Sequence, residues 1–123
     1  MIVVRDAGAR GRGVFAAVDI AEGTLIEECA VLVLPESDVA HLEKTALSDY
    51  YFRWGGTGDQ AAIALGCGSL YNHADVPNAM YVRKTDLLLL AFFAVRPIAA
   101  GEEIRVSYHG GFGQRSAVWF DVL

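Results

Sequence analysis

Short apolar segments separated by glycine clusters are the feature that most limits how this chain can fold. The longest apolar run, residues 87–95, ends at Arg96, and glycines gather at residues 8–13, 55–58, 66–68 and 110–113. A helix that crosses a bilayer needs about 20 apolar residues, so we expect no membrane-spanning helix. Segments of this length, rich in Val, Ile, Phe and Tyr, are typical of strands.

The pattern predicts a mainly β fold, a β-rich α+β domain with one short helix. Apolar residues recur at helical spacing from Val39 to Tyr50, after a stop at Pro35, which predicts a helix at about Ser37–Phe52. The polar stretch Arg83–Asp86 is expected to be a hairpin tip. With 123 residues, of which 54% are hydrophobic, we expect a single domain over residues 1–123. The expected strands are Ile2–Arg5, Val14–Val18, Leu25–Leu34, Met80–Arg83, Leu87–Val95 and Glu103–Tyr108.

The chain also contains a faint internal repeat. Residues 15–26 and 93–104 share Phe, Ala, Ile, Ala, Gly and Ile at matching positions. Each copy is predicted to be a strand, a tight turn and a strand, because Gly23 and Gly101 can adopt the positive φ that such a turn needs. We therefore expect two similar β-hairpins in one domain.

The net charge and the cysteine content limit the partners and the cellular location that we expect. The net charge is −5, so we expect no direct contact with nucleic acid, and an acidic surface suits a Lys- or Arg-rich peptide. The first residues lack a basic stretch followed by an apolar one, which indicates no secretory signal and no membrane partner. We expect a cytoplasmic protein, with delivery into a host cell left open. Cys29 and Cys67 lie in apolar surroundings and are expected to be free thiols.

Three polar segments stand out in this apolar chain: residues 9–16 (ARGRGVFA), 68–79 (GSLYNHADVPNA) and 98–108 (IAAGEEIRVSY). Taken singly, each also fits a simple turn or an edge strand. A Gly-x-Gly before a strand lets the backbone approach a ligand closely, but on its own it is uninformative. Their order and spacing carry the information.

Together these segments resemble the SET-domain protein lysine methyltransferases. Residues 11–16 match the family's Gly-x-Gly-Val-Phe-Ala, residues 72–78 match Asn-His-x-x-x-Pro-Asn, and residues 101–108 match Gly-Glu-Glu-(Leu/Ile)-x-x-x-Tyr. The resemblance covers about residues 2–112. It is nearest to the minimal, free-standing type found in a large-DNA-virus histone methyltransferase, and we expect no Cys-rich zinc segment after the domain.

The resemblance implies a fold of several small β-sheets with a C-terminal pseudoknot. It also implies S-adenosylmethionine as cofactor, and a lysine in a protein or peptide, such as a histone tail, as substrate. Gly11, Arg12 and Gly13 would offer backbone contacts to the cofactor. Asn72 and His73 would hold its amino-acid and adenine parts. A homodimer is expected because the viral type is one.

The family also assigns the reacting end of the site. Tyr108 matches the catalytic tyrosine, which lies beside the cofactor, and Tyr50 matches a tyrosine that lines the lysine channel. Phe112 matches a pocket aromatic, and a Phe there, lacking a hydroxyl, leaves room for a second or third methyl group. Trp119 and Phe120 are candidates for an aromatic cover over the cofactor. The chain departs from the family pattern at Ala74 and Asp75, where Ser-Cys is common, and at Ser107 and His109.

Three other functions remain as alternatives. A SET-like module could bind the cofactor or a lysine-containing peptide without turnover, although it would be expected to have lost Asn72, His73 or Tyr108. A hydrolase could use Cys67, His73 and Asn78, but catalytic Cys and His normally come from distant segments. A metal site built from the three histidines, His41, His73 and His109, would have spacings that match no metal motif.

Overall fold

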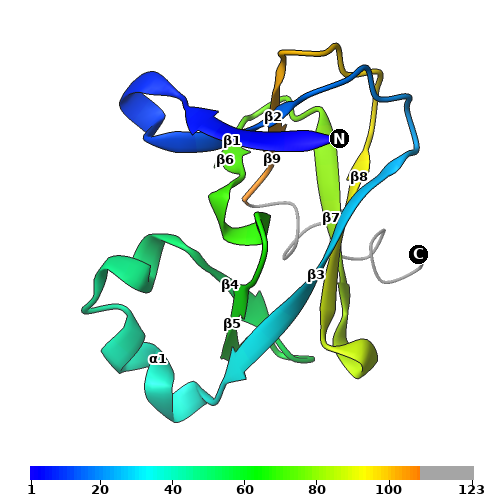
Figure 1. The fold of residues 1–123 in the computed structure, drawn as a ribbon. Helices are drawn as coiled ribbons and strands as arrows, with labels where there is room; N and C mark the ends of the chain where they lie inside the picture. Colours follow the sequence, from blue (N-terminus) through cyan, green and yellow to red (C-terminus); the bar gives the residue numbers. More distant parts are fainter. Residues whose placement is uncertain (109–123) are drawn as a thin grey trace.

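A computed structural model describes residues 1–108, which form two β-sheets (Figure 1). A four-stranded sheet has the order β1-β2-β9-β6, and a five-stranded sheet has the order β4-β5-β3-β8-β7. The first sheet consists of β1 (Ile2–Asp6), β2 (Arg12–Ala16), β9 (Glu103–Val106) and β6 (Asn72–His73). The second consists of β4 (Tyr51–Trp54), β5 (Gln60–Ala64), β3 (Leu25–Leu34), β8 (Leu89–Ala94) and β7 (Ala79–Lys84).

The helices are few and short. One α-helix, α1 (Glu36–Leu42), lies at the end of the molecule opposite the four-stranded sheet (Figure 1). The described residues also contain the 3₁₀ turns η1 (Gly8–Arg10), η2 (Ala46–Asp49), η3 (Gly68–Leu70) and η4 (Thr85–Leu87). None of the helices in residues 1–108 has the length and apolar character needed to traverse a bilayer.

The predicted helix is therefore only partly right. It starts near the expected place but ends at Leu42 rather than at Phe52. Thr45 has an extended backbone (φ −118°, ψ 171°), and its hydroxyl donates to the carbonyl of Leu42 at 2.7 Å. The helix ends here because the extended backbone of Thr45 and its hydrogen bond to Leu42 stop the helical pattern. A 3₁₀ turn and strand β4 follow, so the apolar periodicity across residues 39–50 covers two separate elements.

All six predicted strands are present, with β3 at the predicted bounds. Three further strands, β4, β5 and β6, were not predicted. The first two residues of β4 fell inside the predicted helix, and β6 is only two residues long. β5 reads Gln-Ala-Ala-Ile-Ala, and alanine is depleted in strands, so its pairing partners rather than its composition make it one.

The internal repeat is real, but the prediction that each copy forms a β-hairpin is wrong. The copies pair with each other: Phe15 lies opposite Glu103, Leu25 opposite Phe93, and Ile20 bridges to Ile98. The hydrogen bonds are also symmetric, because the N–H of Gly23 donates to Ala94 and that of Gly101 to Ala16, at 2.8 and 2.7 Å. Both glycines have the expected positive φ (84° and 89°). The two turns therefore join the two sheets around a local twofold axis.

The five-stranded sheet curls until its two edge strands meet. Arg83 of β7 donates from Nε to the carbonyl oxygen of Arg53 of β4 at 2.9 Å. Inside the curl, the ring of Phe52 meets that of Tyr81 edge-on at 5.1 Å, and the buried Phe92 stacks on Tyr71 at 4.2 Å. Aromatic packing of this kind stabilises the curl beyond simple area burial.

The second and third motifs meet in the first sheet. β6 pairs in parallel with β9, so Asn72 lies opposite Arg105 and His73 opposite Val106. The buried Asn78 adds three side-chain hydrogen bonds to the same segment. This is the meeting of segments that the SET resemblance implied at its pseudoknot. The rest of the C-terminal segment, residues 109–123, lies outside the described residues.

Candidate active site

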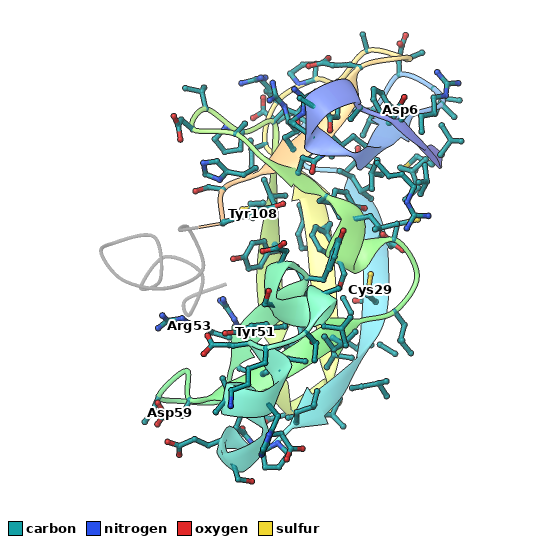
Figure 2. All side chains as sticks on the ribbon, turned by 90° about the vertical axis from the view of Figure 1, so that its left-hand side faces the viewer. Asp6, Cys29, Tyr51, Arg53, Asp59 and Tyr108 are labelled. Atoms are coloured by element: carbon teal, nitrogen blue, oxygen red, sulfur yellow. The ribbon has the colours of Figure 1, made fainter. Side chains whose placement is uncertain are left out.

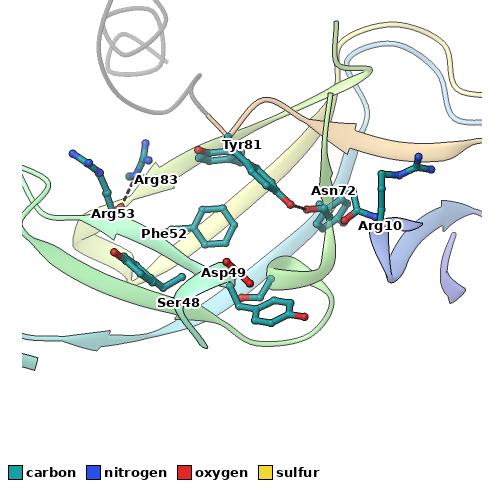
Figure 3. Close-up of a pocket in the computed structure, with 13 residues that line it drawn as sticks. Arg10, Ser48, Asp49, Phe52, Arg53, Asn72, Tyr81 and Arg83 are labelled. Atoms are coloured by element: carbon teal, nitrogen blue, oxygen red, sulfur yellow. Dashed lines mark hydrogen bonds between the residues drawn. The ribbon is translucent and has the colours of Figure 1, made fainter. Parts of the chain in front are cut away.

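A cleft of about 920 Å³ opens between the two sheets. That size is typical of small-molecule sites, which are lined by aromatic side chains and a few polar groups. Figure 3 shows Arg10 and Asn72 at one end, Phe52 and Tyr81 in the middle, and Arg53 and Arg83 at the other end. The lining residues are Arg10, Ser48, Asp49, Tyr50, Tyr51, Phe52, Arg53, Ser69, Tyr71, Asn72, Tyr81, Arg83 and Tyr108.

Asn72 joins the first motif to the third. Its amide nitrogen donates to the carbonyl of Arg12 at 3.1 Å and to a carboxylate oxygen of Glu103 at 2.8 Å. Glu103 also pairs with the guanidinium of Arg10. A Cβ on Gly13 would lie 2.4 Å from the Glu103 carboxylate and 2.8 Å from the Asn72 amide, so any other residue here would displace one of these side chains.

His73 is oriented at both ring nitrogens. Its Nδ1 accepts the backbone N–H of Tyr108 at 3.0 Å, and its Nε2 lies 2.9 Å from a carboxylate oxygen of Asp75. An accepting Nδ1 places the ring proton on Nε2, where it can donate to that carboxylate. The Tyr108 N–H thus determines the tautomer of His73, and Asp75, one of the departures from the family pattern, accepts the proton on Nε2.

Tyr108 enters the cleft from the residues after β9, between the two sheets (Figure 2). Its hydroxyl donates to the carbonyl oxygen of Tyr71 at 2.8 Å. A phenol has one proton to donate, so its oxygen keeps acceptor capacity for another donor. Burial, and then the negative charge of Glu103, raises the pKa of Tyr108 above its ordinary value, so the hydroxyl stays protonated at neutral pH.

Behind the cleft, Glu27 of β3 supports the segment that carries Tyr71. One carboxylate oxygen accepts the Tyr71 hydroxyl at 2.8 Å, and the other accepts the backbone N–H of Cys67 at 3.0 Å. Burial and the Glu27 charge raise the pKa of Tyr71, and the same causes raise the pKa of Cys29 to about 12. Both thiols are free and protonated at neutral pH, as expected.

The structure brings some of the sequence-predicted residues to the cleft wall and others only near it. Tyr50, Asn72 and Tyr108 line the cleft. His73 and Arg12 reach it through their bonds to Tyr108 and Asn72. The remaining two, Gly11 and Gly13, do not line the cleft. The N–H of Gly11 donates to the carbonyl of Gly8 at 3.0 Å, and its carbonyl accepts the N–H of Ala7 at 2.6 Å. Phe112, Trp119 and Phe120 lie outside the described residues.

Sequence reasoning missed most of the lining residues, among them Tyr81 and Arg83. These two follow the buried Ala79 at every second position of β7, and that period of two could have placed them on one face. Glu27 was also missed, although a carboxylate in the apolar strand β3 is a visible signal.

The hydrolase alternative is wrong. The ring nitrogens of His73 are bonded to Tyr108 and Asp75, and the amide of Asn78 is bonded to Glu102, Glu103 and Arg105. Burial raises the pKa of Cys67, the opposite of what an activated thiol needs. As for metals, residues 1–108 hold no group of three or more His, Cys, Asp or Glu side chains arranged for an ion.

Known proteins match both the sequence and this geometry. The SET domain matches residues 11–109. A histone-lysine N-methyltransferase of Schizosaccharomyces pombe, specific for H3 lysine 37, is 34% identical over 106 residues, 85% of this chain and 71% of that protein. A Plasmodium falciparum protein assigned as a histone methyltransferase has a TM-score of 0.70 and 26% identity, over 91% of this chain and 100% of the other. The Chaetomium thermophilum Polycomb Repressive Complex 2 bound to S-adenosylmethionine has a TM-score of 0.75 and 22% identity, over 98% of this chain and 16% of that one.

The fold and the cleft thus define a SET-type domain whose cleft, of small-molecule size, is lined by aromatic side chains. The chain belongs to the SET-domain family of protein lysine methyltransferases, and its cofactor is S-adenosylmethionine. The residues present fit that cofactor, because the cleft combines aromatic faces with the Asp49 carboxylate and the Asn72 amide.

Proposed function

We propose that this enzyme methylates a lysine of a histone or of another protein with a histone-like tail, with Tyr108 as the catalytic tyrosine. The histone part of the proposal is supported by the S. pombe relative, whose own substrate is histone H3. The observation that carries the role of Tyr108 is its hydroxyl, which donates to the Tyr71 carbonyl and keeps an acceptor for the lysine amine.

The cofactor supplies a methyl group on a sulfonium sulfur; the lysine nitrogen takes it, the carbon–sulfur bond breaks, and no metal or covalent enzyme intermediate is required. Asn72, His73 and the backbone of Gly11, Arg12 and Gly13 are proposed to hold the cofactor. Positioning is then the main task of the protein, since an in-line displacement depends on alignment of the reacting atoms.

The attacking lysine must be neutral. A free lysine has a pKa near 10.4, so deprotonation at pH 7 costs about 4–5 kcal/mol. Tyr50, Phe52, Tyr81 and Tyr108 surround the proposed channel, and their rings lower the lysine pKa by desolvation. Their faces also attract the methylated ammonium product through cation–π contact. The neutral phenol of Tyr108 orients the amine without competing for its proton.

Labelled cofactor tests this proposal. Purified protein is incubated with tritiated S-adenosylmethionine and core histones, and histone tail peptides follow. We expect incorporation that Tyr108→Phe abolishes, and a smaller loss for Tyr51→Phe, whose hydroxyl is bonded to Glu43 at 2.9 Å instead. Full activity in Tyr108→Phe would refute the assignment. Calorimetry with S-adenosylhomocysteine should show weaker binding for Asn72→Ala, and unchanged binding would remove Asn72 from the cofactor site.

Further proposals concern features that the sequence suggested. We propose that Phe112 permits a second or third methyl group, which Phe112→Tyr would restrict to one in a mass-spectrometric assay.

We propose a single domain of the minimal type that forms a homodimer in the cytoplasm and does not contact nucleic acid. Exposed leucines support the dimer, and its mass by light scattering tests it. They are Leu25, Leu32, Leu47, Leu65, Leu87 and Leu88.

A further inference from the structure

Glu103 is a nearly buried carboxylate at the end of the cleft where Figure 3 shows Arg10 and Asn72. Its side chain is 8% exposed, and its strand β9 lies between β2 and β6 in the four-stranded sheet. One carboxylate oxygen, Oε1, pairs with the guanidinium of Arg10, and the Nε of Arg105 lies 3.9 Å from the same oxygen. The other oxygen, Oε2, accepts a hydrogen bond from the side-chain amide of Asn72 at 2.8 Å. Glu103 therefore joins two guanidinium groups to the amide of Asn72.

These contacts determine which way the amide of Asn72 faces. Its nitrogen, Nδ2, carries two N–H groups and has two acceptors, the carbonyl of Arg12 at 3.1 Å and the carboxylate of Glu103 at 2.8 Å. A carbonyl and an ionised carboxylate can only accept, so a turned amide would place its own oxygen against both of them. The nitrogen is therefore held toward Arg12 and Glu103. Asn72 lines the cleft, and its oxygen, Oδ1, is the polar atom that remains for a ligand there.

An amide oxygen in this position favours one kind of ligand group. Oδ1 accepts hydrogen bonds and cannot donate them, and such bonds are stronger when the donor is a cation. Within residues 1–108, the hydrogen bonds of the Asn72 side chain all use Nδ2. S-adenosylmethionine carries an ammonium group on the α-carbon of its methionine part, and that group is a cationic donor that suits Oδ1.

We propose that Glu103 is a positioning residue for the cofactor, which acts through Asn72 by keeping the amide oxygen turned toward the α-ammonium group. This inference rests on the proposed function, because it takes Asn72 to lie in the cofactor site. Glu103 has no need to touch the cofactor itself. The guanidinium of Arg10 holds Oε1, which leaves Oε2 for Asn72, so each oxygen of the carboxylate has a separate task.

Glu103→Gln is the informative variant, because it keeps the shape of the side chain and replaces one oxygen by an NH₂ group. The oxygen that remains is attracted to the guanidinium groups, so the NH₂ group faces Asn72. Asn72 can accept from that NH₂ group only by turning its amide, which places Nδ2 toward the cleft, where it opposes an ammonium group. We expect this variant to lose affinity for ligands that carry the ammonium group and to keep its affinity for ligands that lack it.

Competition calorimetry with two ligands tests the proposal. They are S-adenosylhomocysteine and its des-amino analogue, which lacks only the α-amino group, and the ratio of their affinities is called the ammonium preference. A hydrogen bond that involves a charged group changes an affinity by about 10-fold or more, so Glu103→Gln should lower the ammonium preference by about that factor. Binding of the des-amino analogue should be unchanged, which also shows that the variant is folded.

Two further variants locate the effect. Glu102→Gln makes the same change in charge one residue away, where the side chain bonds to Asn78 and to the backbone N–H of Ala99, and it should keep the ammonium preference. Asn72→Ala removes the amide and should abolish the preference. Adding Glu103→Gln to Asn72→Ala should then cause no further loss of preference, because Glu103 acts through the amide.

Each remaining outcome is decisive. Equal weakening of both ligands in Glu103→Gln would indicate a purely structural role and would overturn the proposal, as would an unchanged ammonium preference. A further loss in the double variant, the same loss in Glu102→Gln, or no ammonium preference in the wild-type protein would overturn it too. The expected pattern of binding, with no methylation of any histone or peptide, would leave the role of Glu103 standing and would refute the proposed function instead.

Discussion

The contact between Glu27 and Tyr71 gives the sharpest test of how the core supports the site. Glu27→Ala removes two hydrogen bonds to a carboxylate and leaves the hydroxyl of Tyr71, a residue that is 2% exposed, without its partner. Bonds to charged groups contribute about 1.5–3 kcal/mol each, and an unpaired buried hydroxyl costs about 1–3 kcal/mol. The lost hydrogen bonds and the unpaired hydroxyl partly count the same interaction. We therefore expect Glu27→Ala to lower the free energy of unfolding by about 3–5 kcal/mol.

A double-mutant cycle isolates the pair. Tyr71→Phe removes the same hydroxyl while keeping the ring that stacks on Phe92. Urea unfolding of wild type, Glu27→Ala, Tyr71→Phe and the double variant should give a coupling energy of about 1.5–3 kcal/mol. Glu27→Gln, which keeps the volume, provides a milder variant in case the alanine protein does not fold. A coupling energy below about 0.5 kcal/mol would refute the reasoning.

Loss of the contact between Glu27 and Tyr71 should also lower the rate of methyl transfer. The carbonyl of Tyr71 accepts the hydroxyl of Tyr108, so a shift of residue 71 misplaces the proposed catalytic group. We expect folded Glu27→Gln to lose kcat more than cofactor affinity. Equal losses in both would indicate a general loosening of the fold.

Three further predictions follow from individual contacts. Asn78→Ala should lower the free energy of unfolding, measured in urea, by about 2–4 kcal/mol, because a buried side chain loses three hydrogen bonds to the β9 segment. A decrease in that free energy of less than about 1 kcal/mol would contradict this expectation. Burial, and then the Glu27 charge, raises the pKa of Tyr71 above 10.0, so the folded state keeps a proton that the unfolded chain releases near pH 10. Stability should fall as pH rises above about 10, less steeply in Tyr71→Phe, and equal slopes would argue against the shift. Asp75→Ala should lower the free energy of unfolding by less than about 1 kcal/mol, because the Asp75 side chain is 96% exposed. A larger loss of stability, measured by the melting temperature, would show that the tautomer of His73 matters more than the His73–Asp75 pair itself.

Much of the secondary structure follows from local patterns, and the errors have definite causes. β3 has ten residues, of which all but Glu27 and Glu28 are apolar, so its bounds are predicted correctly. The helix is overextended because Leu42 and Tyr50 share a helical spacing although Thr45 separates them. β5 was not predicted because its alanines prefer helix, and only its neighbours β3 and β4 hold it as a strand.

The residues of the candidate site also divide into those that the sequence identified and those that it did not. Tyr50, Asn72 and Tyr108 could be identified by motif, because the chemistry needs particular side chains at recognisable spacings. Tyr81, Arg83 and Glu27 could not, since their roles depend on what lies across the cleft or behind it. The motif identifies three residues of the cleft wall, and the structure adds those that surround them.

The sequence by itself determines the strand-length segments, the turns at Gly23 and Gly101, and the motifs of a SET-domain methyltransferase. Backbone preference and residue chemistry are local, so they can be read from neighbours in the chain. Only the tertiary structure decides that the two repeats pair with each other, that β6 lies parallel to β9, and that the curled sheet brings Arg53 to Arg83. Those contacts join residues dozens of positions apart, and burial of shared apolar surface, which is insensitive to sequence order, selects them.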